Sequence, residues 1–176
     1  MSIMNFKYFR DPDNFAFKTD EPMKCSVCGM LGVWFDAGGF YGIDEIECIC
    51  DDCLAAGKLK ALEIEANEAF GGSAEEIEEI EEIIFATPAL PTWQGCVWPY
   101  VDGSFCVFER IASKQDFDSK EEFKRAFSNK VAEQSDLEWL WQTLPEKTVE
   151  NYQQGGDVTV YLFSNNGAKY CTWDAN

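Results

Sequence analysis

Cys25-Ser-Val-Cys28-Gly29 and Cys50-Asp-Asp-Cys53 are two C-x-x-C motifs, with 21 residues between Cys28 and Cys50. Each C-x-x-C turn can aim two thiolates at one tetrahedral ion, and the pairing is typical of a four-cysteine zinc site. Gly29 suits such a turn, because a small residue lets backbone N–H groups approach the thiolates. The spacing predicts one structural zinc ion on Cys25, Cys28, Cys50 and Cys53. Buried thiols without a metal, and a disulfide or redox pair, are the alternatives.

The chain contains no histidine. A zinc ion would therefore take cysteine ligands, with a carboxylate as the alternative additional ligand, and a closed four-cysteine site leaves no open position for water. The lack of histidine also removes Ser-His-Asp and Cys-His mechanisms and the commonest general base. We therefore expect a protein that is not an enzyme. Catalysis by carboxylates, lysine or lone cysteines is the less favoured alternative.

The length and composition predict a protein with a substantial core. The 176 residues suit one domain with a small zinc lobe, and 46% of them are hydrophobic. No apolar run is long enough for a membrane span, and the N-terminus lacks the features of a secretory signal. With eight cysteines and no export signal, we expect reduced thiols and a cytoplasmic location.

The net charge of −18 is extreme for this length. Nucleic acid is not the expected ligand, because phosphate contacts need Lys and Arg on one face. A basic protein partner, reached by electrostatic steering, fits the charge better. Plain solubility explains the charge as well.

The first 70 residues form the predicted zinc-binding lobe. Residues 31–35 and 40–43 read as the two strands of a hairpin around a glycine turn. The second C-x-x-C motif then opens a predicted helix over residues 54–70. Motif, hairpin, motif and helix together suggest a treble-clef-like arrangement, with residues 71–176 packed against it as one compact unit.

Residues 71–176 predict a mixture of helices and antiparallel strands. Capping boxes at residues 73–76 and 119–122 each open a helix, and a further helix covers residues 137–144. Asp102-Gly103 and Asn165-Asn166-Gly167 are hairpin turn signals. The second turn joins strands at residues 158–163 and 169–173. The fold class that follows is α+β.

A run of glutamates covers most of the helix that begins near residue 73. Like charges at i,i+4 repel, so keeping them together suggests an electrostatic use. We expect a partner-binding surface there; a solvated helix face and carboxylate metal binding are the alternatives. The candidate partner-binding residues are Glu75, Glu78, Glu79 and Glu82.

Several stretches in order along the chain resemble the CbrC family of colicin-tolerance proteins. They are Phe6-Lys7-Tyr8 before Asp11-Pro12, both C-x-x-C motifs, Thr87-Pro88 with Trp93-Gln94, residues 102–108, and Tyr161-Leu162-Phe163. The resemblance implies a small cytosolic bacterial protein that binds zinc through the four motif cysteines. It also implies an association with tolerance to a bacteriocin and no enzymatic activity.

The remaining cysteines and the tryptophans are expected to be structural. The family tends to carry a further C-x-x-C-G after its Tyr-Leu-Phe strand, where this chain has Ser164-Asn165-Asn166-Gly167. We therefore expect Cys48, Cys96, Cys106 and Cys171 to be buried core residues. Most tryptophans should be buried too, with Trp93 and Trp98 in the Pro-rich loop of residues 87–99 as the exposed exceptions.

Three classes of function compete on these grounds. The first is an acidic zinc-binding immunity or tolerance protein that neutralises a basic toxin. The second is a zinc-stabilised adaptor or regulatory protein with an unrelated partner. The third is an enzyme that works through carboxylates. A flat acidic patch would favour the first class, and a pocket with paired carboxylates the third.

Overall fold

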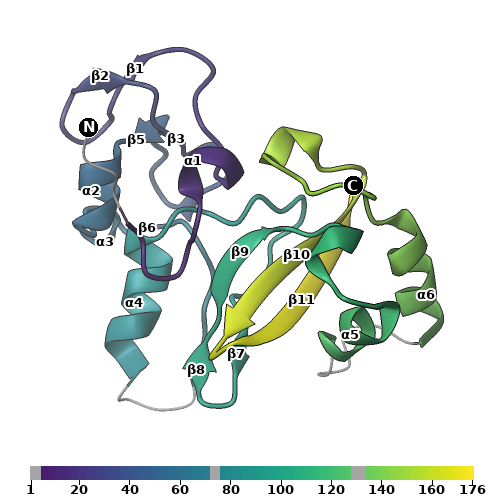
Figure 1. Cartoon of the computed structure of the whole chain (residues 1–176). Coiled ribbons are helices and arrows are strands. Elements are labelled where there is room, and N and C mark those ends of the chain that lie inside the picture. Colours follow the sequence, from purple (N-terminus) through teal and green to yellow (C-terminus); the bar gives the residue numbers. More distant parts are fainter. Residues whose placement is uncertain (1–4, 72–75, 128–133) are drawn as a thin grey trace.

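A computed structural model describes residues 5–71, 76–127 and 134–176 of the chain. It confirms the α+β class, with short helices and antiparallel strands (Figure 1). The cysteine motifs lie in a lobe of two-residue strands and short helices, and a three-stranded sheet forms the other half of the molecule.

The longest strands form one antiparallel sheet in the order β11-β10-β9. Its strands are β9 (Val107–Ile111), β10 (Val158–Asn165) and β11 (Ala168–Ala175). Asn166 and Gly167 join β10 to β11, both with positive φ, which is the backbone that a two-residue type I′ turn needs. The same chemistry at Asp102-Gly103 joins β7 (Tyr100–Val101) to β8 (Ser104–Phe105). Both predicted hairpins are confirmed.

The two faces of β10 belong to two separate cores, because successive strand side chains point to opposite sides. Val160 and Leu162 pack against a helical layer of α5 (Lys120–Arg125) and α6 (Gln134–Thr143). Tyr161 and Phe163 face the larger core, which extends into the cysteine-bearing lobe. The sheet therefore lies between the helical layer and that lobe (Figure 1).

Phe108 is the centre of the larger core. Its ring lies 4.9 Å from that of Phe9 and 5.4 Å from that of Phe163, between centroids, and Phe15 and Tyr161 are further ring neighbours. The N-terminal arm also bonds to the backbone of β9: the Phe108 N–H donates to the Tyr8 carbonyl at 2.8 Å. Aromatic rings from both ends of the chain thus meet at one residue.

The predicted hairpin of residues 31–35 and 40–43 is wrong. The lobe instead pairs β1 with β2, β3 with β5, and β4 with β6. The bounds are β1 (Met23–Lys24), β2 (Leu31–Gly32), β3 (Phe35–Asp36), β4 (Tyr41–Gly42), β5 (Cys48–Ile49) and β6 (Ile64–Glu65). The strands hold only two residues each, so distant partners rather than local alternation decide the pairing.

The predicted helix over residues 54–70 is also wrong. It is divided into α2 (Asp51–Ala55) and α3 (Leu59–Leu62), and the chain then enters β6. Gly57 and Glu63 adopt left-handed backbone after each helix, the usual way for a helix to end. A short α1 (Pro12–Phe15) precedes the lobe.

The helix predicted from residue 73 appears as α4 (Ile77–Ala86). Residues 73–75 of its expected capping box lie outside the described residues. Ile77 at its start is 52% exposed, and Ile83 is fully buried. Ile80 and Ile84 are packed against the core.

The expected burial of the lone cysteines is confirmed for three of the four. Cys48, Cys106 and Cys171 are fully buried, while Cys96 is half-buried. The expected burial of most tryptophans is wrong, because Trp139 is 45% exposed and Trp34, Trp141 and Trp173 are half-buried. Trp98, expected to be exposed, is 1% exposed, because its indole N–H donates to the Cys106 carbonyl at 2.7 Å inside the core. Within residues 5–71, 76–127 and 134–176, no helix has the length and apolar character needed to cross a membrane.

Candidate metal centre

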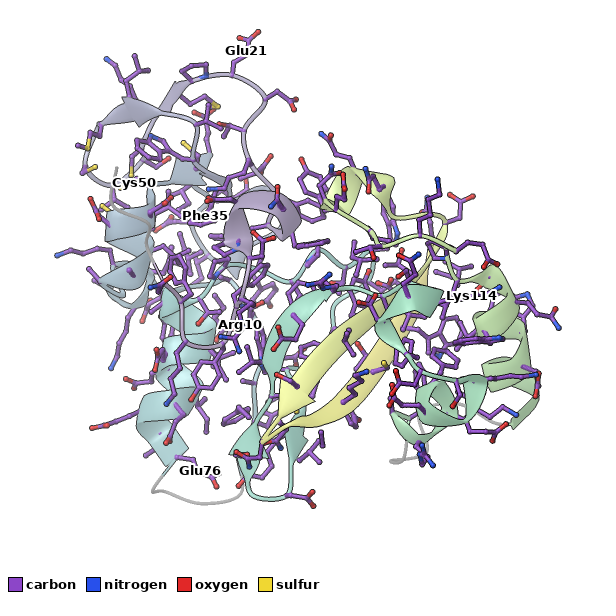
Figure 2. All side chains as sticks on the ribbon, in the orientation of Figure 1. Arg10, Glu21, Phe35, Cys50, Glu76 and Lys114 are labelled. Carbon is purple, nitrogen blue, oxygen red and sulfur yellow. The ribbon has the colours of Figure 1, made fainter. Side chains whose placement is uncertain are left out.

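The four motif cysteines converge on one point. All four Sγ atoms lie within 4.8 Å of one another, and Cys28 Sγ is 3.7 Å from Cys50 Sγ. Zinc–sulfur bonds of about 2.3 Å in a tetrahedron place neighbouring sulfurs about 3.8 Å apart. Figure 2 shows sulfur atoms gathered beside the labelled Cys50, next to α2. Cys25, Cys28, Cys50 and Cys53 can therefore hold a metal ion.

The first motif is a tight turn between β1 and β2. The Cys25 N–H donates to the Met30 carbonyl, and the Gly29 N–H donates to the Cys25 carbonyl, both at 2.8 Å. Gly29 has φ +78°, which a side chain would strain. The turn aims the Val27 N–H at Cys25 Sγ, at 3.4 Å. Gly29 therefore supplies the left-handed backbone of the turn rather than the small size that the sequence suggested, because a Cβ there would meet no atom within 4 Å.

The second motif begins a helix. Cys50 is the N-cap of α2, and its Sγ accepts a hydrogen bond from the Cys53 N–H at 3.5 Å. One helical turn then brings Cys53 beside Cys50. The Cys50 N–H donates to Cys25 Sγ at 3.3 Å, so the two motifs are bonded to each other through a ligand sulfur.

Ser26 joins the two motifs, a role that the C-x-x-C pattern does not predict. Its Oγ accepts from the backbone N–H groups of Glu47 and Cys48, at 3.2 and 3.3 Å. Its own N–H donates to the Cys48 carbonyl at 3.0 Å. A serine inside C-x-x-C is only a weak signal, because its partners are about twenty residues away.

Cys48 is close to the metal-binding cysteines in sequence but has a different role. Its thiol donates to the Lys24 carbonyl at 3.2 Å, and burial raises its pKa. It therefore serves as a small buried residue beneath the turn, and the four-ligand set excludes it.

Four ionised sulfurs at one site need a compensating positive charge. Burial opposes ionisation of Cys25, yet N–H groups of Cys28, Cys50 and Val27 lower its pKa to about 6. At Cys53, burial and then the neighbouring sulfurs raise the pKa. The pKa of Cys50 is likewise raised, first by burial. A metal cation removes this conflict, because it allows all four sulfurs to be thiolates at once.

The candidate partner-binding glutamates lie apart from the cysteines. Glu75 lies outside the described residues, Glu78 is exposed, and Glu79 and Glu82 are half-buried. Figure 2 places the labelled Glu76, at the start of α4, far below Cys50. The sulfur cluster and the acidic helix are therefore two separate features of the surface.

The comparisons with known proteins assign a family and no activity. No solved structure matches the chain. A family model matches residues 3–173, nearly the whole length. The chain therefore belongs to the uncharacterised protein family UPF0167.

Proposed function

We propose that this protein is a non-catalytic binding protein stabilised by one structural zinc ion and directed to a basic protein partner. The observation that carries the zinc assignment is the convergence of four Sγ atoms within 4.8 Å. Four thiolates complete a tetrahedral shell, so no position stays open for a reactive water. Zinc-binding thiols also suit a reducing compartment, which supports a cytoplasmic location.

Protein purified under reducing conditions without chelator should contain one zinc ion per chain. Four-sulfur sites accept zinc or iron, and iron–thiolate centres absorb visible light whereas zinc is colourless. Metal analysis by plasma mass spectrometry, with an absorption spectrum, therefore decides the metal. Protein without a stoichiometric metal would contradict the zinc assignment, and so would a red iron centre.

The charge distribution supports a basic partner. The chain has 32 acidic and 14 basic residues. Among the described residues, eight of the basic side chains are already in ion pairs with carboxylates. They are Arg10, Lys18, Lys60, Arg110, Lys114, Lys120, Lys124 and Lys169. The excess of acidic side chains therefore gives the protein a negative electrostatic potential, which attracts an approaching basic protein.

The resemblance to colicin-tolerance proteins supports a basic toxin as one such partner. An acidic inhibitor can cover the substrate-binding face of a toxin that acts on nucleic acid, because both present negative charge. An adaptor or regulatory protein with another basic partner would have the same electrostatic requirement. The lack of histidine supports binding over catalysis in either case.

Replacing Glu78 and Glu82 of α4 by Gln should slow association with a basic partner and leave the fold intact. Raising the salt concentration should slow association of the wild-type protein in the same way, since exposed charges are screened over about 8 Å at physiological ionic strength. Stopped-flow association rates across a salt series measure both effects. Glu121→Gln combined with Glu150→Gln is the matched control, because it removes the same charge from exposed positions outside α4. An association rate that changes neither with salt nor with these substitutions would contradict the electrostatic proposal.

A further inference from the structure

A cavity of about 900 Å³ opens beside the cysteine-bearing lobe. Four segments form most of its walls: residues 17–20, residues 36–41, residues 65–70, and residues 89–96 of the Pro-rich loop. Pockets that bury most of a small organic ligand have volumes of about 300–1,000 Å³. The cavity, here called the aromatic cleft, thus has room for a short peptide segment.

The lining of the aromatic cleft is rich in exposed rings. Trp93 is 56% exposed, Phe70 64% and Tyr41 79%. Phe17 and Tyr152 form an edge-to-face pair in the wall, with centroids 5.0 Å apart. Large aromatic side chains gathered around one hollow are typical of a binding surface, whereas scattered ones are not.

Carboxylates outnumber cations in the lining of the cleft. Four carboxylates line the cleft: Asp20, Asp36, Glu65 and Glu68. The single cation among the lining residues is Lys18. Its Nζ lies 3.8 Å from Asp13 Oδ1 and 3.7 Å from Asp51 Oδ1. Its Nζ also lies 3.9 Å from the centroid of the Phe35 ring. Lys18 is therefore already engaged, and the cleft presents negative charge beside π faces.

Hydrogen bonds of two side chains, Asn67 in the lining and Asp174 behind it, hold the walls of the cleft in place. The Asn67 side chain donates to three carbonyls, those of Ile83, Thr87 and Pro88, and accepts from the Leu90 N–H. This amide fixes the start of the Pro-rich loop.

Asp174 of β11 fixes the middle of that loop. Its Oδ2 accepts from the N–H groups of Trp93 and Gln94, at 2.7 and 3.0 Å. Its Oδ1 accepts from the buried Tyr161 hydroxyl at 2.7 Å. The Trp93 backbone is thereby preorganised, which lowers the entropic cost of binding.

We propose that the aromatic cleft binds an arginine-bearing segment of the basic partner. A guanidinium stacks on aromatic faces and pairs with carboxylates through its planar fork, and the cleft offers both groups together. This inference rests on the proposed binding of a basic protein and identifies where that protein's cationic side chains are received.

A tetra-arginine peptide tests the proposal, with tetra-citrulline as the uncharged peptide of the same shape. Both are titrated into the full-length protein by calorimetry. We expect the arginine peptide to bind and the citrulline peptide to bind far more weakly. Trp93→Leu should weaken arginine-peptide binding about two- to fivefold, the range for one cation–π contact. Glu68→Gln should weaken it as well. Both side chains are exposed, so the fold should survive, and an unchanged unfolding temperature checks this.

Glu121→Gln on α5 is the matched control, because it removes one exposed acid that lies neither in the cleft nor on α4. If it weakens peptide binding as much as Glu68→Gln does, the attraction is diffuse and the cleft proposal is overturned. Equal binding of the two peptides, or none by the wild type, overturns it too. The peptide titrations do not measure the salt dependence of partner association, so the proposed function is tested separately.

Discussion

Cys50→Ser should abolish zinc binding and unfold the region between β1 and α2, while the sheet β11-β10-β9 stays folded. Cys50 is a proposed ligand, and its sulfur also accepts from Cys53 at the start of α2. Serine is itself a good N-cap, so the substitution removes the ligand and keeps the cap. Zinc contributes about 10–16 kcal/mol in small zinc-binding peptides, far more than two-residue strands can replace.

Metal analysis and hydrogen exchange together measure this effect. Exchange should rise across residues 23–55 and stay low in β10. Trp34 gives a local signal, because its indole N–H donates to the Met30 carbonyl, at 2.8 Å, beside the first motif. Cys96→Ser is the control: Cys96 is half-buried at the aromatic cleft, and zinc should be retained. A Cys50→Ser protein with full zinc content and wild-type exchange would overturn the ligand assignment.

The features that the sequence predicted correctly are those set by local chemistry. The C-x-x-C turns depend on residues a few positions apart, and Gly29 supplies the backbone that the first one needs. Asn166-Gly167 and Asp102-Gly103 determine their hairpins in the same way. Ser119 caps α5 by accepting from the Glu122 N–H, as its capping box predicted.

The features that the sequence did not predict depend on contacts between distant segments. β4 pairs with β6 across more than twenty residues, so alternation within residues 40–43 could not identify the partner. Trp98 is buried because Phe163 and the Cys106 carbonyl complete its site. The aromatic cleft depends on Asp174, which is 81 positions from Trp93. Such sites exist only once the chain has folded.

Phe108→Ala should reduce the free energy of unfolding by about 3–5 kcal/mol, the range for a buried aromatic residue in a close-packed core. Phe108 is fully buried, and rings from both ends of the chain contact it. The loss should be measurable by urea denaturation of the zinc-loaded protein. Phe70→Ala, at a ring that is mostly exposed, should change the stability by no more than about 0.5 kcal/mol.

Folded Phe108→Ala should still contain one zinc ion, because no ligand lies on β9. The two variants would then have opposite effects. Cys50→Ser loses the metal and unfolds only the region around it, whereas Phe108→Ala keeps the metal and lowers the free energy of unfolding of the whole protein. That contrast follows from the architecture, in which the sulfur cluster holds a lobe with little core of its own and the aromatic core joins that lobe to the sheet. If Phe108→Ala released the zinc from protein that is still folded, the lobe would depend on the core for its metal, and the separation proposed here would be wrong.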